Sequence, residues 1–366
     1  MYTHKVYDDI DQIPMISQQW DAIVDSDFHG NPFLSTAWYI NWLRHFVGDA
    51  ELKIITICYN GDIQGVFPLV ISREKVHGVR YRVLKMAENI YTPICCPIVM
   101  QHNMGEVIDV FIHQVLPTLD WDFISFIHLA PEYPVNEILA SMMRSARYQT
   151  YWVAHEGNWV FCSDNGLNSE AYFSQLNTNI RNNTKRYPRK LAELGDFAFE
   201  MVKSDITDAD IFDYMTVYAN SWKEPEIDLT FHPDLMRVAS ASGSLRLGFL
   251  KINGIPIATQ LWLYTNKRGY IVKLAYDEAY KKYSTGTVLT WLIVKNLIDE
   301  EGMLFFDFLR GDDDYKRNWM NTRRERYQLI AYNRNLQGKI AYMSEQVAVP
   351  KLRKSRLVRK VKTLIH

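Results

Sequence analysis

The stretch FFDFLRGDDDYKRNW, residues 305–319, places an apolar strand-like run directly before three aspartates, a tyrosine, a lysine and a tryptophan. Alternation along the run turns the Asp307 carboxylate to the opposite sheet face from Phe306 and Phe308. In an α/β sheet, ligands usually bind just beyond the carboxyl ends of the strands. We therefore expect a cleft here, and the candidate catalytic residues are Asp307, Asp312, Tyr315 and Lys316.

Each of these side chains suits a different part of a group transfer. Carboxylates can hydrogen-bond an acceptor amine, Lys316 can neutralise a phosphate, Tyr315 can orient a sugar hydroxyl, and Trp319 can pack under a sugar ring. A Mg²⁺ site at 312–314 is an alternative, since hard cations take carboxylates. Consecutive aspartates seldom converge on one ion, so we predict no metal. At least one of them is expected to cap the next helix.

A second candidate site is the segment YIVKLAYDEAYKKYSTGTVLTWLI, residues 270–293. The pattern predicts a strand that ends near Tyr276, a polar loop, and a helix that opens at 285–287. A helix N-terminus offers unpaired N–H groups to a phosphate. Gly286 would let a ligand approach the backbone, and Lys282 adds positive charge. The plainer alternative is that Ser284 is an ordinary helix cap.

Two segments of the chain match each other without a gap. LKIITICYNGDIQGVFPLVI (52–71) and LRLGFLKINGIPIATQLWLY (245–264) both place Asn-Gly between apolar runs at the same offset. Asn-Gly between β-rich runs is the strongest short-range hairpin signal, because a type I′ turn needs positive φ at both central residues. We interpret the two copies as a duplicated domain.

The order of elements around the hairpins supports a duplication. A helical pattern at 33–46, with Ser35 as N-cap, precedes the first hairpin, and two helical patterns at 208–222 and 233–242 precede the second. Each hairpin is followed by strand, helix and strand. This alternation predicts an α/β fold. A long polar helix at 168–195, bent before Pro188, lies between the copies. We place an N-terminal domain at 1–165, a C-terminal domain at 166–345 and a basic tail at 346–366.

Composition narrows the class of protein. The 366 residues are 48 % hydrophobic and carry a net charge of −1, and cations without any acid are concentrated in the tail. The more acidic body argues against broad DNA binding. Four cysteines without a CxxC pair predict no disulfide framework, and neither a signal peptide nor a membrane span is evident. We predict a cytoplasmic protein. For the tail, 350–366, two interpretations are open: an amphipathic helix in peripheral contact with a membrane, or a basic terminus that frays in solvent.

The order helix–helix–hairpin–strand–helix–strand resembles the acyltransferases of the GNAT superfamily. YDEAYKKYSTG (276–286), followed at helix length by FFDFLRGDDDYKRNW, resembles the FemAB-like, CelD/BcsL-type acetyltransferases. The resemblance implies an α/β fold of tandem GNAT-like (acyl-CoA N-acyltransferase) domains, with mixed sheets flanked by helices. It also implies that the first domain is a degenerate copy which shapes the acceptor cleft.

The resemblance also assigns roles to residues. The loop and helix start at 283–287 would hold the pyrophosphate of acetyl-CoA or another acyl-CoA, although Tyr283 and Val288 depart from the general GNAT pattern. The implied donor-binding residues are Lys273, Leu274, Ala275, Lys282, Ser284, Thr285, Gly286 and Thr287. The implied substrate-binding residues are Trp222, Lys223, Gln260, Tyr276, Asp277 and Trp319. Gln260 interrupts an apolar strand, so it would contact substrate in a cleft or lie on an exposed face.

These observations predict an acyltransferase that moves an acyl group from acyl-CoA to an amine or hydroxyl of a polysaccharide or cell-envelope precursor. The acceptor would be a small molecule or a lipid-linked sugar. No nucleophile motif such as G-x-S-x-G is present, and direct attack of an amine on a thioester needs none. Two alternatives remain open: a Fem-type transferase that uses aminoacyl-tRNA, and a non-catalytic glycan-binding protein.

Overall fold

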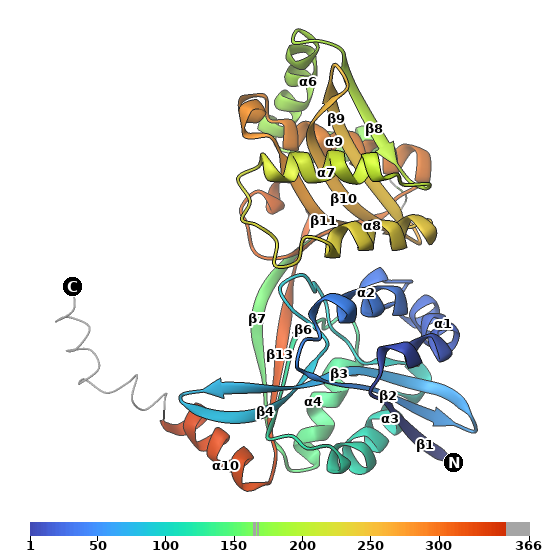
Figure 1. Cartoon of the computed structure of the whole chain (residues 1–366), viewed down its shortest axis with the longest axis vertical. Coiled ribbons are helices and arrows are strands. Elements are labelled where there is room, and N and C mark those ends of the chain that lie inside the picture. Colours follow the sequence, from blue (N-terminus) through green and yellow to red (C-terminus); the bar gives the residue numbers. More distant parts are fainter. Residues whose placement is uncertain (164–165, 167, 349–366) are drawn as a thin grey trace, which may run out of the picture. The chain divides into compact units, whose positions relative to one another are not determined.

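The computed structural model describes residues 1–163, 166 and 168–348, which form two compact units (Figure 1). Unit 1 comprises Met1–Phe28, Phe33–His155 and the residues from Arg326 onward, and unit 2 comprises His29–Pro32 and Glu156–Glu325. The predicted membrane-binding tail at 350–366 lies outside the described residues. Within the described residues, no helix is both long and apolar enough to cross a bilayer.

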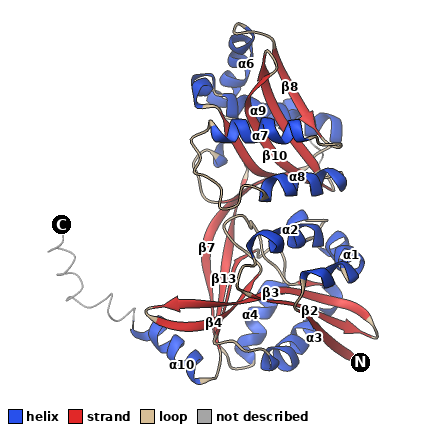
Figure 2. Cartoon of the chain, viewed as in Figure 1, coloured by secondary structure: helices blue, strands red, loops and turns tan. Residues whose placement is uncertain are grey.

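Unit 1 is a mixed sheet with helices packed on it, as the alternation of elements predicts (Figure 2). Its strands follow the order β1-β2-β3-β4-β6-β13-β7, and the short β5 pairs with β3. The strands are β1 (Tyr2–Tyr7), β2 (Glu51–Tyr59), β3 (Asp62–Val76), β4 (Val79–Met86), β5 (Ile98–Val99), β6 (Phe123–Leu129), β7 (Gln149–Cys162) and β13 (Thr322–Tyr332). The α-helices are α1 (Ser17–Asp27), α2 (Thr36–Phe46), α3 (Met104–Val110), α4 (Val135–Ser145) and α10 (Leu336–Tyr342).

Unit 2 repeats this plan with the strand order β8-β9-β10-β11-β12-β7. Its strands are β8 (Phe197–Val202), β9 (Leu245–Ile252), β10 (Ile255–Thr265), β11 (Arg268–Tyr276) and β12 (Phe305–Arg310). Its α-helices are α5 (Ser169–Gln175), α6 (Thr178–Ala192), α7 (Asp208–Ala219), α8 (Phe231–Ala241) and α9 (Thr285–Glu301), and two 3₁₀ helices complete the unit, η6 (Glu278–Tyr283) and η7 (Lys316–Asn318).

Both predicted hairpins are confirmed. Strands β2 and β3 turn at Asn60 and Gly61, with φ values of 52° and 98°, and strands β9 and β10 turn at Asn253 and Gly254, with φ values of 50° and 77°. Positive φ at both central residues is the type I′ geometry that Asn-Gly favours. The prediction that Ser35 caps a helix is also confirmed, since its hydroxyl accepts a hydrogen bond from Trp38 N at the start of α2.

The core of unit 2 lies between its sheet and α9. Helix α9 buries an apolar face that includes Val288, Ile293 and Leu297, and these side chains pack against β9, β10 and β11 together with α5 and α6. Helices α7 and α8 cover the opposite face of the sheet (Figure 1). This packing fixes α9 on the sheet. Its N-terminus follows the short connection from the carboxyl end of β11.

The two halves of the sequence exchange their last strands. The carboxyl half of β7 pairs with β12 in unit 2, and the carboxyl half of β13 pairs with β6 in unit 1. The packing units therefore divide at 155 and 326, whereas the sequence suggested 165 and 345. A division into contiguous segments misses this exchange because strand pairing is non-local.

Two local predictions are wrong in detail. The polar segment 168–195 forms two helices, α5 and α6, because Asn177 accepts a hydrogen bond from Ile180 N and starts a new helix there, while Pro188 lies inside α6. The apolar run TPICCPIVM (92–100), whose composition favours a strand, contains only the short β5.

A glycine pair tests whether the C-terminal segment is part of unit 1. A Cβ at Gly338, in α10, would lie 2.3 Å from Asn333 O and 2.6 Å from Asp122 O, whereas a Cβ at Gly105, in α3, meets nothing within 4 Å. We expect Gly338→Ala to destabilise unit 1 by about 1–3 kcal/mol through overpacking against backbone.

Urea-induced unfolding of the full chain measures this effect. Gly105→Ala, in a helix, is the control. It should leave the free energy of unfolding unchanged or raise it by up to about 1 kcal/mol, because alanine lowers the conformational entropy of the unfolded chain. Equal stabilities of the two variants would contradict the close contact at Gly338.

Candidate active site

Strands β11 and β12 separate soon after they begin. Their parallel pairing joins only Arg268–Tyr270 to Phe305–Asp307, although β11 continues to Tyr276. Beyond Tyr270, β11 is paired only with β10 within the part of the chain that the structure describes. The sheet ladder is therefore open on one side of this part of β11, and the predicted donor-binding residues Lys273, Leu274 and Ala275 lie on this open segment.

The N-terminus of α9 begins beside the end of β11. Ser284 adopts a left-handed conformation (φ 50°, ψ 40°) that joins η6 directly to α9, and its side chain does not cap the helix. Thr285 is fully buried, and its Oγ1 has no hydrogen-bond partner among the described residues. The alternative that Ser284 is an ordinary cap is therefore wrong, and the first-turn N–H groups of α9 lack a side-chain acceptor from it.

Gly286 and the residues around it bring the helix close to β11. A Cβ at Gly286 would lie 3.2 Å from Tyr276 Cδ1, so only glycine fits here without displacing that ring. The Tyr276 ring in turn packs on Trp222 at a centroid distance of 4.3 Å. Asp277 caps η6 by accepting a hydrogen bond from Ala279 N at 2.8 Å, so its carboxylate holds the loop.

Two predicted substrate contacts are corrected. Gln260 is 1 % exposed, and its amide donates to Thr290 Oγ1 at 2.7 Å and accepts from Trp262 Nε1 at 2.9 Å. It lies neither in an open cleft nor on an exposed face, because α9 covers its side of β10. Trp319 is 6 % exposed and packs in the core near Phe308. Both residues stabilise the fold under the site.

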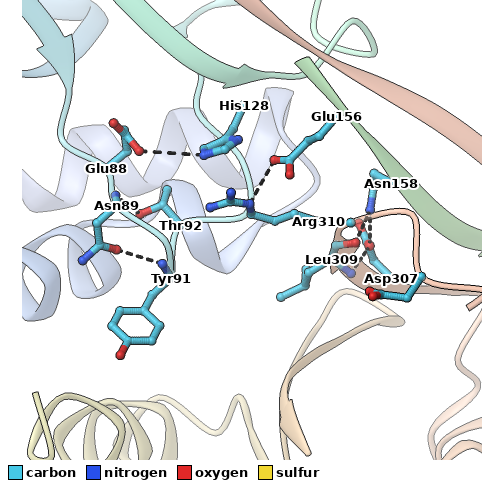
Figure 3. A network of polar contacts seen from close by, with 12 residues as sticks. Glu88, Asn89, Tyr91, Thr92, His128, Glu156, Asn158, Asp307, Leu309 and Arg310 are labelled. Carbon is cyan, nitrogen blue, oxygen red and sulfur yellow. Dashed lines mark hydrogen bonds and ion pairs between the residues drawn. The ribbon is translucent and has the colours of Figure 1, made fainter. Parts of the chain in front are cut away.

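A bulge at the end of β12 shapes the turn that follows. The register with β7 shifts between Asp307 and Arg310, and Leu309 has a φ of 57°. Asp307, 5 % exposed, accepts hydrogen bonds from Leu309 N at 2.6 Å and Asn158 Nδ2 at 2.7 Å (Figure 3). Asn158 also donates to Leu309 O, and Arg310 pairs with Glu156 at 2.9 Å. Asp307 therefore positions the bulge rather than presenting a free carboxylate.

Lys316 is directed into the same turn. Its ammonium donates to Leu309 O at 3.3 Å, to Arg310 O, and to Gly311 O at 3.4 Å, and it pairs with Asp313 at 3.3 Å. The side chain is 4 % exposed, and burial lowers the pKa of Lys316 while Asp313 opposes that shift. These contacts occupy the donors that were predicted to meet a phosphate.

The aspartates at 312–314 each have a separate cation. Asp312 accepts from Arg323 Nε at 2.9 Å and from Trp159 Nε1 at 2.7 Å, Asp313 pairs with Lys316, and Asp314 pairs with Arg317. Hydrogen bonds from Arg323 lower the pKa of Asp312, so this carboxylate is a weak base. The partners of Asp312 come from β7 and β13, and no local sequence signal marks them.

Tyr315 remains at the surface of this turn. Its side chain is 43 % exposed, and its ring lies 6.1 Å from that of Phe308. Partial burial and the nearby Asp313 carboxylate raise the pKa of Tyr315 well above its ordinary value. The phenol therefore stays protonated at neutral pH and is suited to donate a hydrogen bond rather than to act as a base.

The corresponding place in unit 1 is filled by the chain itself. Strands β4 and β6 pair at only two positions, Val83–Phe123 and Leu84–Ile124. Beyond them, Cys95 forms a parallel bridge to Leu129 and donates from its N–H to His128 O at 3.0 Å. The separation that leaves one side of β11 open in unit 2 is thus closed in unit 1 by the segment around Cys95.

Comparison with known proteins agrees with this geometry. Residues 178–317 match the family described as "Acetyltransferase (GNAT) domain". The matched segment lies within unit 2. The predicted α/β fold of GNAT type and the predicted acyltransferase class are thereby confirmed, and the matched residues run from the start of α6 to η7. No curated protein matches the sequence.

Solved structures resemble nearly the whole chain. FemX is 12 % identical with a TM-score of 0.63, over 90 % of this chain and 98 % of FemX. L-PGS from Bacillus licheniformis is 11 % identical with a TM-score of 0.51, over 90 % of this chain and 96 % of L-PGS. The C-terminal domain of a putative lysylphosphatidylglycerol synthetase from Agrobacterium fabrum is 13 % identical with a TM-score of 0.54, over 90 % and 94 %. At these identities the likeness concerns the fold, which is FemAB-like.

Asp307 offers a test of the bulge. Asp307→Ala leaves Leu309 N and the Asn158 amide without their buried acceptor, so we expect unit 2 to lose about 1–3 kcal/mol of stability. Urea-induced unfolding of the full chain checks this value. Asp314→Ala, in the same segment but with its carboxylate 88 % exposed, is the control and should change stability by less than about 0.5 kcal/mol. A neutral Asp307→Ala would contradict the positioning role.

Proposed function

We propose that unit 2 binds an acyl-CoA, such as acetyl-CoA, and transfers its acyl group to an amine or hydroxyl of a polysaccharide or cell-envelope precursor. The donor would lie along the open side of β11, at Lys273, Leu274 and Ala275. Its pyrophosphate would meet the N-terminus of α9, where the donor-binding residues are Lys282, Ser284, Thr285, Gly286 and Thr287.

The observation that carries this proposal is the early separation of β11 from β12 beside an uncapped helix N-terminus. An extended carrier can lie beside a strand whose neighbour has turned away, as an added strand would. The partial positive charge of the α9 N-terminus favours phosphate. The match of residues 178–317 to a GNAT domain supports the same donor.

The transfer itself needs no protein nucleophile. The acceptor nitrogen or oxygen attacks the thioester carbonyl, the new C–N or C–O bond forms, and the C–S bond breaks with release of the thiol, while the proton lost by the acceptor restores the phenol that protonates the thiolate. A backbone N–H of β11 would stabilise the oxyanion. Tyr315, which stays protonated, is suited to give a proton to the leaving thiolate. Asp307, Asp312 and Lys316 support the turn that carries Tyr315.

Two observations bear on the nature of the acceptor. The names of FemX and of the lysylphosphatidylglycerol synthetases point to cell-envelope chemistry. A small-molecule or lipid-linked sugar acceptor is consistent with Trp222, which is 45 % exposed beside Tyr276. A cytoplasmic location, with membrane contact through 350–366, stays part of this proposal.

Unit 1 would not bind a donor of its own. The place that corresponds to the β11 opening is filled by Cys95 and its neighbours. We infer that unit 1 is a degenerate copy that serves the acceptor.

Gly286 provides the test of the donor site. Gly286→Asp adds a negative charge at the helix N-terminus, where it stabilises the helix but repels a phosphate. Gly286→Asn has nearly the same shape without the charge, so both variants meet the Tyr276 ring equally. Titration calorimetry with acetyl-CoA should show binding to the wild type and a loss of about tenfold or more in Gly286→Asp relative to Gly286→Asn. No binding of acetyl-CoA by the wild type would defeat the proposal.

A second candidate donor is aminoacyl-tRNA, and helix α6 is the observation that favours it. Five cations and no acid lie along α6: Arg181, Lys185, Arg186, Arg189 and Lys190. Among the described residues, no carboxylate forms an ion pair with any of them. The helix reaches the donor loop, since Asn183 donates to Ser284 Oγ at 3.5 Å and Tyr187 packs edge-on against Tyr283. Such a surface can neutralise several phosphates of an RNA backbone.

Charge reversal on α6 separates the two donors. We expect Lys185→Glu with Arg189→Glu, both at exposed positions, to weaken tRNA binding by about tenfold or more at physiological salt if RNA is the donor. Acetyl-CoA binding should remain unchanged. A filter-binding assay with bulk tRNA measures the first effect, and Lys295→Glu on α9 is the control. Wild-type protein that binds acetyl-CoA but not tRNA would remove this candidate.

A further inference from the structure

Three lysines of unit 2 come together from distant parts of the sequence. Lys223 lies in the connection between α7 and α8, Lys273 on the open segment of β11, and Lys316 in η7 after the bulge. Lys273 and Lys316 are both close enough to act electrostatically on Lys223. Like charges repel, so a cluster of this kind costs free energy unless anions are nearby.

Two of these lysines have a carboxylate of their own. Lys273 pairs with Glu226 at 2.7 Å, and Lys316 pairs with Asp313 at 3.3 Å. Lys223 differs, since across the described residues no carboxylate lies within ion-pair distance of its ammonium. That ammonium lies 5.2 Å from the centroid of the Trp222 ring. Asp307 and Glu156 add negative charge near Lys316, whereas Lys223 is the lysine whose ammonium has no carboxylate partner among the described residues.

This charge lies next to the proposed donor site. Trp222 packs on Tyr276 at 4.3 Å, and the Tyr276 ring contacts the position of Gly286 at the start of α9. An anion held at Lys223 would therefore lie close to the proposed donor site. We propose that Lys223, supported by the charges of Lys273 and Lys316, binds an anionic group of the acceptor, a phosphate or a carboxylate. The identification of this anion as part of the acceptor rests on the proposed function.

The environment of Lys223 makes the site sensitive to pH. Burial lowers the pKa of Lys223 first, and the repulsion from Lys273 and Lys316 lowers it further, while Glu226 and Asp313 oppose the shift. A bound anion would favour the charged ammonium and raise this pKa again. Anion binding should therefore take up protons at alkaline pH, and affinity should fall as the pH rises through the lowered pKa.

Titration calorimetry of the full chain tests the proposal with two probes, glucosamine 1-phosphate and glucuronic acid. We expect one of them to bind at least about tenfold more weakly to Lys223→Met than to the wild type, and Lys223→Arg to keep most of the affinity. Lys295→Met, which removes a lysine paired with Asp299, should bind like the wild type. Buffers of different ionisation enthalpy should reveal proton uptake in the wild type that is missing in Lys223→Met.

The outcomes separate this inference from the proposed function. A response to the phosphate probe alone assigns a phosphorylated acceptor, and a response to the acid alone assigns a carboxylate. Gly286→Asp should weaken acetyl-CoA but leave probe binding unchanged, and Lys223→Met should do the reverse. Equal probe binding by the wild type and Lys223→Met, or no binding by either, overturns the inference even where acetyl-CoA binds. Loss of acetyl-CoA binding with intact Lys223-dependent probe binding would instead defeat the donor assignment.

Discussion

Unit 2 is organised around the short stretch over which β11 and β12 remain paired. Three residue pairs hold the strands together, and the bulge at Leu309 then turns β12 aside while β11 continues to Tyr276. A strand whose groups are unpaired on one side is costly unless water or a ligand satisfies them. Every feature that supports acyl transfer lies along this opening, from the α9 N-terminus to the turn that carries Tyr315. The buried face of α9 and the hydrogen bonds of Gln260 keep the two sides of the opening fixed.

The acidic turn after β12 is mainly an electrostatic framework. Its carboxylates are matched with cations one by one, and Asp312 illustrates the result, because Arg323 holds it ionised and so makes it a weak base. Lys316 is similarly committed to backbone carbonyls. Charges neutralised in pairs fix geometry but contribute little reactivity. Among the described residues around this turn, the Tyr315 phenol and the Lys223 ammonium keep hydrogen-bond donors that a substrate can use.

Local signals in the sequence were sufficient for the hairpins, the helix starts and the GNAT-like order of elements, because turn and cap preferences depend on a few neighbouring residues. They were insufficient wherever a partner comes from far along the chain. Gln260 has the composition of a ligand contact, and only the packing of α9 shows that Thr290 receives its amide. The attachment of Asp312 to Arg323 likewise depends on where β13 runs. The basic charge of α6 was visible in the sequence, whereas its position beside the donor loop was not.

The exchange of β7 and β13 has a consequence for how the protein is made. A ribosome releases the chain from its N-terminus, and domains commonly fold in that order during synthesis. Here unit 1 lacks the strand that covers β6 until β13 has emerged, after unit 2. Its sheet must wait with an uncovered edge while unit 2 is synthesised, and such an edge invites association with other chains. Unit 1 is therefore completed only after unit 2 has been made, and we expect chaperone assistance to be most important in that interval.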